Sequence, residues 1–279
     1  MNFRILIIMV LAGFTFNNVN AQEQKAPSLV LDGIYEKDVT EEKGIIPYDH
    51  IREADVFWSK RIWRVIDVRE KMNLRFKYPR QTLISIIHES SMNGELTVYR
   101  NVPGEGDRFV EELPLDEVLN LGKSVDTSIQ IDPITLEEVV VIAENELEYD
   151  KVVKYRVKED WFFDEETSTF QVRIIGLAPV RMDFDRMGNY RGDEVMYWVY
   201  YPDLRPILTK FEAYNAGNDA IQLSWEDIFE ARLFTSYIFK ESNVHDRTIS
   251  EYTTGVEALL ESERIKNELF ELEHDLWSY

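Results

Sequence analysis

Two stretches in the middle of the chain decide the fold: Val153-Lys154-Tyr155-Arg156-Val157-Lys158 and Phe170-Gln171-Val172-Arg173-Ile174. In both, apolar and polar side chains alternate, which is the period of a β-strand that buries one face. Residues 164–168 lie between the two stretches and supply the turn. The pattern therefore predicts an antiparallel hairpin.

Helical periods surround this hairpin. Before it, the apolar spacing predicts a helix over 51–72, whose stripe is Ile51, Ala54, Trp58, Ile62, Val65 and Met72. A second helix is predicted over 81–90 and a strand over 95–100. The aromatic and branched run 195–201 is typical of a strand that is covered on both faces or lies in a contact surface. Together these elements predict an α+β fold over residues 49–222, with an antiparallel sheet flanked by helices.

The C-terminal region, 223–279, is predicted to be helical. Ser224 and Asp227 resemble a capping box before the apolar residues of 228–238. A heptad-like seam follows, formed by Ala258, Ser262, Ile265, Leu269, Leu272 and Leu276. That seam is long enough to dock a helix on a neighbouring surface, but too short for an independent coiled coil.

The N-terminus has the pattern of an export signal. Arg4 precedes an apolar run over residues 5–16, and small residues close the segment at Ala21, so we expect cleavage after residue 21. An uncleaved anchor is the alternative. Residues 22–48 are expected to form an extended arm, because Pro and Gly interrupt a segment with few apolar residues. No later run approaches the roughly 20 apolar residues of a membrane span, so none is expected.

Composition restricts the compartment and the partners. The sequence has 279 residues, 52 of them acidic and 31 basic, for a formal charge of −21, and 44% are hydrophobic. This composition predicts a globular protein and disfavours nucleic-acid binding through net charge. The absence of cysteine excludes disulfides, thiolate metal sites and a lipid-modified N-terminal cysteine. A periplasmic or secreted protein fits these features.

Catalytic motifs are missing from the sequence. The four histidines have no metal-ligand spacing, and Gly-x-Ser-x-Gly does not occur. Adjacent carboxylates are frequent, as at 111–112, 137–138 and 164–166, but 52 acidic residues produce such pairs by chance. We therefore expect no enzyme activity, no catalytic residue, no metal and no cofactor. The alternative is a periplasmic glycan hydrolase that uses two carboxylates.

One segment approaches a calcium-binding loop. Asp183, Asp185, Gly188 and Glu194 occupy ligand positions of that pattern, but Met187 stands where another oxygen belongs. The flanking residues have strand character, so the sequence favours a hairpin turn at 187–189. Ion binding by 183–194 is left open.

Charge is strongly segregated along the chain. Residues 60–80 contain eight basic and two acidic residues, whereas 257–275 contain seven acidic and two basic residues. Complementary charges of this kind direct docking. We therefore predict a protein interface formed by Lys60, Arg61, Arg64, Arg69, Lys71, Glu261, Glu268 and Glu271. The two segments either meet within one subunit, remain as solvated faces, or join neighbouring copies head to tail.

Several segments resemble the gliding-motility GldN family, called PorN in non-gliding relatives. They are DGIY at 32–35, IREADVFWSKRIWRVIDVREKMN at 51–73, KEDWFFD at 158–164, RIIGLAP at 173–179 and LSWEDIFEAR at 223–232. The resemblance spans most of the chain after the export signal.

The resemblance implies a non-catalytic periplasmic subunit of the type IX secretion system of Bacteroidota. In that family the subunit forms a ring with the lipoprotein GldK or PorK beneath the outer membrane, and it is linked to the inner-membrane motor component GldM or PorM. The resemblance transfers no catalytic residue. A chain without its own lipidated cysteine would need such a lipoprotein to hold it at the membrane.

Overall fold

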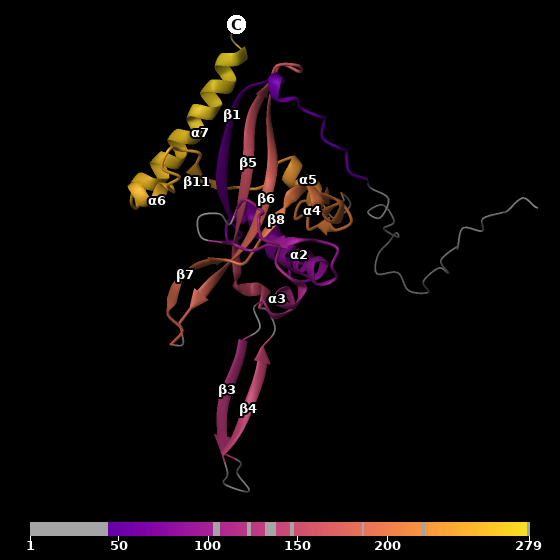
Figure 1. Ribbon diagram of the computed structural model, residues 1–279, viewed down its shortest axis with the longest axis vertical. Helices are drawn as coiled ribbons and strands as arrows, with labels where there is room; N and C mark the ends of the chain where they lie inside the picture. The colour runs from indigo at the N-terminus through magenta and orange to yellow at the C-terminus, as the bar shows by residue number, and fades with distance from the viewer. Residues whose placement is uncertain are drawn as a thin grey trace, which may run out of the picture. The chain divides into compact units, whose positions relative to one another are not determined.

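The computed structural model describes residues 44–277, except 103–106, 122–123, 132–137, 146–147, 186, 219–220 and 222. Its main feature is an antiparallel sheet with the strand order β11-β1-β5-β6-β8-β2, in which β7 also pairs with β6 (Figure 1). The strands are β1 Val56–Asp67, β2 Val98–Tyr99, β5 Val152–Asp164, β6 Thr169–Phe184, β7 Tyr190–Val195, β8 Trp198–Tyr200 and β11 Tyr237–Glu241. Helices pack against this sheet, so the predicted α+β class is confirmed.

The predicted central hairpin is confirmed as β5 and β6. Its register pairs Val157 with Leu177 and Phe163 with Phe170. The turn is stabilised by Asp164, whose carboxylate accepts hydrogen bonds from the Glu166 amide at 3.0 Å and the Thr167 hydroxyl at 2.8 Å. Both strands extend beyond the alternating stretches seen in the sequence, because further residues are covered on both faces of the sheet.

The predicted helix over 51–72 is wrong. These residues form a short 3₁₀ helix η1 (Glu53–Asp55), the long strand β1, and a second 3₁₀ helix η2 (Lys71–Lys77). Strand β1 lies between β5 and β11. The outer half of β1 alternates in burial, whereas residues 62–66 are all buried. A strand covered on both faces loses its period of two, and its aromatic and branched residues then also fit a helical stripe.

Short helices cover the inner half of the sheet. They are α2 Leu83–Met92, α3 Leu115–Asn120, α4 Tyr201–Leu208 and α5 Trp225–Glu230. The α2 helix confirms the prediction for 81–90. The predicted strand over 95–100 is reduced to β2, and 195–201 is divided among β7, β8 and the start of α4.

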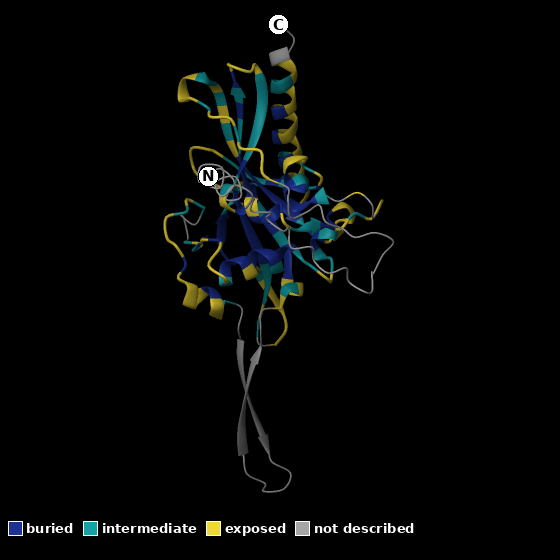
Figure 2. Cartoon of the chain, turned by 90° about the vertical axis from the view of Figure 1, so that its right-hand side faces the viewer, coloured by how far each residue is buried: buried dark blue, intermediate teal, exposed yellow. Residues whose placement is uncertain are grey.

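The main core lies between these helices and the sheet, where Figure 2 shows the densest group of buried residues. Phe76 of η2 is at its centre. The Phe76 ring lies 5.6 Å from Tyr155, 5.1 Å from Trp225 and 6.0 Å from Phe229, between ring centroids. These separations are typical of attractive tilted and edge-to-face aromatic pairs. The four aromatic side chains of this group therefore pack against one another in the core.

Two small sheets were not predicted. Strands β3 (Ser124–Ile131) and β4 (Glu138–Asn145) pair with each other, and β9 (Glu212–Ala213) pairs with β10 (Leu223–Ser224). A third 3₁₀ helix, η3 (Tyr149–Lys151), leads into β5.

The C-terminal region is helical only in part. The capping box is confirmed, since the Ser224 hydroxyl and the Asp227 carboxylate each bond the other's backbone amide. The predicted continuation to residue 238 is wrong, because α5 ends at Glu230. Arg232 then adopts φ of 52°, and the following residues join the sheet edge as β11. Pairing with β1 overrides the helical spacing there.

The final helix, α7 (Val256–Trp277), confirms the seam prediction for its described side chains. Ser262, Ile265 and Leu269 are buried. The α7 helix lies beside β11 and β1, preceded by the single turn α6 (Ile249–Tyr252) (Figure 1). None of the described helices has the length and apolar character that a membrane crossing needs.

Some predictions fall outside what the structure describes. The export signal at 1–21 and the arm up to residue 43 lie outside the described residues, whereas residues 44–50 contain no helix or strand. The boundaries 49–222 and 223–279 stay predictions.

Candidate protein interface

The predicted basic residues do not form one patch. Because residues 60–64 lie on a strand, successive side chains point to opposite faces of the sheet. Lys60 and Arg64 share the face of Ile62, which packs against α7, and Arg61 is on the other face. Only a helix would have brought these side chains onto one stripe.

Three of the five basic residues have acidic partners in their own chain. Lys60 forms an ion pair with Glu241 at 2.6 Å, and Arg69 pairs with Asp67 at 2.5 Å. Arg61 donates two hydrogen bonds to Asp160, at 2.6 and 2.7 Å. The Arg69 guanidinium lowers the pKa of the Asp67 carboxyl below its ordinary value. Three of the eight cations in residues 60–80 are therefore compensated by acidic residues of the same chain.

Arg64 and Lys71 differ from the other three. Arg64 is buried, and its Nε donates to the Ser236 hydroxyl at 2.9 Å. Burial lowers the pKa of its guanidinium. Lys71 is exposed. Neither side chain forms an ion pair with an acidic residue in the part of the chain that the structure describes.

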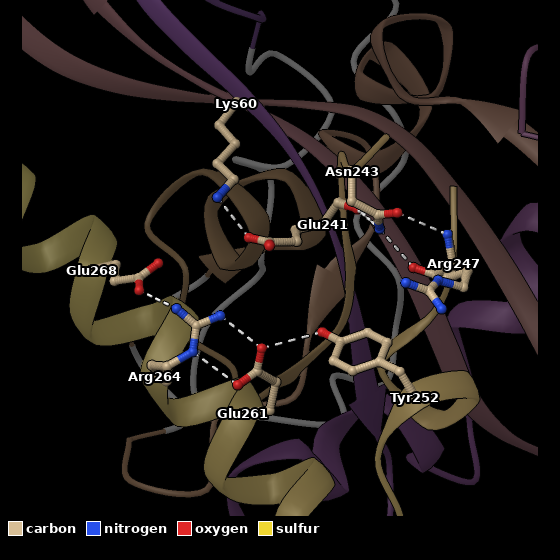
Figure 3. A network of polar contacts seen from close by, with 8 residues as sticks. All are labelled: Lys60, Glu241, Asn243, Arg247, Tyr252, Glu261, Arg264 and Glu268. Carbon is tan, nitrogen blue, oxygen red and sulfur yellow. Dashed lines mark hydrogen bonds and ion pairs between the residues drawn. The ribbon is translucent and has the colours of Figure 1, made fainter. Parts of the chain in front are cut away.

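Two of the three predicted acidic residues of α7, Glu261 and Glu268, pair with Arg264 of the same helix (Figure 3). Arg264 bonds Glu261 at 2.6 and 2.8 Å and also bonds Glu268. Glu261 in addition accepts a hydrogen bond from the Tyr252 hydroxyl at 3.3 Å. Glu271 is exposed. Within the described residues no ion pair joins α7 to the basic segment, so the two meet through apolar packing. Contact between neighbouring copies stays a prediction.

A second basic surface lies on η2, and of its residues the sequence predicted only Lys71 as an interface residue. In a 3₁₀ helix residues three apart lie on one face. Asn73 and Phe76 form the buried row. Lys71, Met72, Leu74 and Arg75 stand on the other faces, and we call these four residues the η2 surface. The sequence KMNLRFK at 71–77 gives no local signal for this surface, because the buried row combines the polar Asn73 with Phe76.

The η2 surface is held in place by Asn73. Its side-chain amide donates to the carbonyls of Asp67 and Thr235, at 2.8 and 2.9 Å, and accepts from the Thr235 amide at 3.0 Å. Met72 and Leu74 are 52% and 57% exposed on this fixed turn. Apolar side chains beside cations, on a rigid backbone, are typical of protein contact surfaces.

Arg205 anchors the described end of the N-terminal arm. It is buried, pairs with Glu226 at 2.7 Å, and donates to the Ile46 carbonyl at 3.0 Å. Its guanidinium carbon lies 4.0 Å from the Tyr48 ring centroid, and the Tyr48 hydroxyl donates to Glu230. Burial, together with Glu230, raises the Tyr48 pKa well above its ordinary value. Sequence patterns gave no signal for this anchor, because its members are far apart in the chain.

The segment 183–194 forms the β6–β7 turn, as predicted. Asp185 accepts hydrogen bonds from the amides of Met187 and Asn189, at 2.9 and 2.8 Å, and Gly188 adopts φ of 80°. Glu194 pairs with Arg181 at 2.8 Å. Among the described residues no group of three or more His, Asp or Glu side chains is arranged to hold a metal ion.

Comparison with known protein families gives one match. The sequence model of the family described as "Gliding motility associated protein GldN" matches residues 51–278, which includes every described strand and helix. No curated protein matched the chain.

Proposed function

The chain belongs to the GldN family of gliding-motility-associated proteins, and from that membership we propose a non-catalytic structural subunit of the type IX secretion and gliding machinery. The single observation that supports this role most is the family match over 51–278. The export-signal pattern at residues 1–21 supports a periplasmic location.

Its partner at the outer membrane, in this proposal, is the lipoprotein GldK or PorK, with which it assembles as a ring. The inner-membrane component GldM or PorM is the second partner. A sequence without cysteine has no site for its own lipid anchor, so a lipoprotein would supply attachment. The subunit would brace the assembly while another component performs the mechanical work.

We place the lipoprotein contact on the η2 surface. Three of the predicted basic residues, Lys60, Arg61 and Arg69, are paired with acids within the chain. Lys71 and Arg75 form no ion pair with any residue in the described ranges, and they flank the exposed side chains of Met72 and Leu74. Uncompensated cations favour an acidic partner surface, and the apolar side chains add area that leaves water on contact.

The test is co-purification of the mature chain with the candidate lipoprotein. Replacing Lys71→Glu together with Arg75→Glu reverses the charge of the η2 surface, and we expect at least about fivefold less lipoprotein to be recovered. The matched control replaces two exposed cations outside this surface that likewise form no ion pair within the described residues, Arg108→Glu and Lys210→Glu. Circular dichroism confirms that both variants fold.

If both double variants recover equal amounts of the lipoprotein, the η2 surface does not form the contact. Failure of the unmodified chain to bind the lipoprotein would contradict the proposed partner itself.

A further inference from the structure

A cavity of about 380 Å³ lies between α7 and the sheet. Its walls come from four parts of the chain: Arg64 of β1, Trp161 of β5, Arg232 after α5, and the α7 residues Lys266, Leu269 and Phe270. Lys266 and Phe270 are exposed, which places the cavity opening along α7. The volume falls within the range of about 300–1,000 Å³ that is typical of small-ligand sites.

Positive charge dominates this cavity although the protein is strongly acidic. Arg64, Arg232 and Lys266 line it, against the single carboxylate of Glu273. Arg232 is already neutralised, because its Nη2 donates to both oxygens of the fully buried Glu159, at 2.8 and 3.1 Å. Arg64 and Lys266 therefore carry the charges left for a ligand, and the nearby carboxylates of Glu159 and Glu273 offset only part of them.

Arg64 is the strongest indication of a binding site. The residue is 8% exposed, and its closest described polar partner is the neutral Ser236 hydroxyl. In register along β1 it lies between Ile62, which joins the α7 cluster, and Ile66, which joins the main core. A buried guanidinium beside a cavity, without an ion pair to any described carboxylate, carries a desolvation cost that an anion in the cavity would offset.

The remaining walls are apolar. Leu269 is buried, the Phe270 side chain is exposed at the rim, and the Trp161 ring is held by a hydrogen bond from its Nε1 to Glu159 at 3.0 Å. An inorganic anion would leave these surfaces in contact with water. A ligand with both a charged group and an apolar body would use the whole cavity.

We propose that this cavity binds a carboxylate carried on an apolar body about the size of one hydrophobic amino-acid residue. Arg64 and Lys266 bind the carboxylate, since a guanidinium can form two parallel hydrogen bonds with that group. Trp161, Leu269 and Phe270 contact the apolar body. A free small carboxylic acid and the C-terminal residue of a peptide share this chemistry. The proposal goes beyond the structural role proposed above and does not depend on it.

Calorimetric titration of the mature chain with N-acetylphenylalanine tests the proposal. We expect a dissociation constant of about 1 mM or lower, which is realistic for a ligand of this size. The matched probe is N-acetylphenylalanine amide, which keeps the shape and removes the charge. It should bind at least about tenfold more weakly, because a hydrogen bond to a charged group is lost.

Two substitutions locate the binding. Arg64→Met should weaken N-acetylphenylalanine binding at least about tenfold, with folding checked by circular dichroism. Lys266→Ala changes an exposed residue that forms no ion pair within the described residues, and it should weaken binding about two- to fivefold. The control Lys210→Ala changes an exposed lysine outside the cavity lining and should leave affinity unchanged.

A second titration, with a short peptide, distinguishes a peptide C-terminus from a free carboxylic acid as the natural ligand. Tighter binding of Gly-Gly-Gly-Phe with a free C-terminus than of N-acetylphenylalanine supports a peptide terminus, and weaker binding supports a free acid. No heat at about 10 mM N-acetylphenylalanine, or equal binding of the acid and the amide, would overturn the proposal. If the Lys266→Ala variant binds N-acetylphenylalanine with unchanged affinity, the carboxylate does not bind in this cavity. This conclusion holds even if Arg64→Met fails to fold.

Discussion

One face of β1 is shared by two apolar clusters of very different size. The inner end of the strand, at Ile66, belongs to the main core beneath α2, α4 and α5. The outer end, at Ile62, belongs to a small cluster with Ile238, Ile249 and two residues of α7. The inner end of β1 is therefore packed in a large core, whereas α7 is attached to the outer end through a small cluster of apolar side chains.

The exposed surface of α7 sharpens this contrast. Leu259, Leu260 and Phe270 are 59%, 64% and 68% exposed, although the helix has apolar neighbours on its other side. The cluster that joins α7 to the sheet is much smaller than the main core, so we expect α7 to be held less strongly than the core helices. We expect the main core to unfold as one cooperative unit and α7 to detach at lower free energy.

The largest expected effect is in the main core. Phe76→Ala removes the ring that contacts Tyr155, Trp225 and Phe229, and should lower the free energy of unfolding by about 3–5 kcal/mol. Urea titration of the mature chain measures this loss. The control is Phe57→Ala, a strand residue whose side chain is 71% exposed, and it should change stability by less than about 1 kcal/mol. Similar losses for both variants would contradict the central position of Phe76.

The α7 seam is the next test. Ile265→Ala empties a fully buried position, and we expect a cost of about 2–3 kcal/mol that appears mainly as local detachment of α7. Hydrogen exchange should rise in α7 and β11 but not in α2 or β6. Leu259→Ala, on the exposed side of the same helix, is the control. Uniform loss of protection throughout the sheet would show that α7 and the main core are one unit.

The opposite face of the sheet offers a smaller effect. A Cβ at Gly176 would lie 2.6 Å from Cζ and 3.2 Å from Cε1 of Phe109, which packs on this face. Gly176→Ala should therefore displace that ring and cost about 1–3 kcal/mol in unfolding free energy. Gly192→Ala is a matched control, because nothing lies within 4 Å of its added Cβ. Equal stabilities of the two variants would mean that Phe109 does not occupy this position.

The smallest effect concerns pH and His88. This buried residue has no hydrogen bond at Nδ1 to any described group, and burial lowers its pKa below the ordinary value of 6.5. Protonation therefore favours the unfolded chain, so stability is full above pH 6.5 and falls as the pH drops below it. The loss is at most about 1.4 kcal/mol per pH unit for one proton.

His88→Gln should flatten the pH dependence of the unfolding free energy between pH 7 and 5, relative to the control His245→Gln at an exposed position. The same slope in both variants would assign the acid sensitivity to other groups.

The sequence predicted the elements that have one buried face and one solvent-exposed face. The β5–β6 hairpin alternates because of that asymmetry, and the α7 seam repeats at heptad spacing for the same reason. The Ser224 capping box was readable because its two residues are three apart in the chain.

Strands β1 and β11 were missed for a physical reason. Residues 62–66 of β1 are buried on both faces, so alternation disappears, and residues 237–241 become a strand only by pairing with β1. The predicted interface was affected by the same error. On a strand, Lys60 and Arg61 point to opposite faces of the sheet, and Arg64 is buried. Lys71 is the basic member that remains exposed without a described ion pair. The contacts of Arg205 and Arg64 depend on tertiary structure that no local pattern encodes.

In the proposed function, this chain acts through its exterior as a subunit of a larger assembly. Light scattering of the mature chain purified with its candidate lipoprotein tests this claim most directly. We predict that both proteins elute together in a particle many times heavier than even the full 279-residue chain of 32.9 kDa. Elution of the chain as a solitary monomer, with the lipoprotein in separate fractions, would contradict the account.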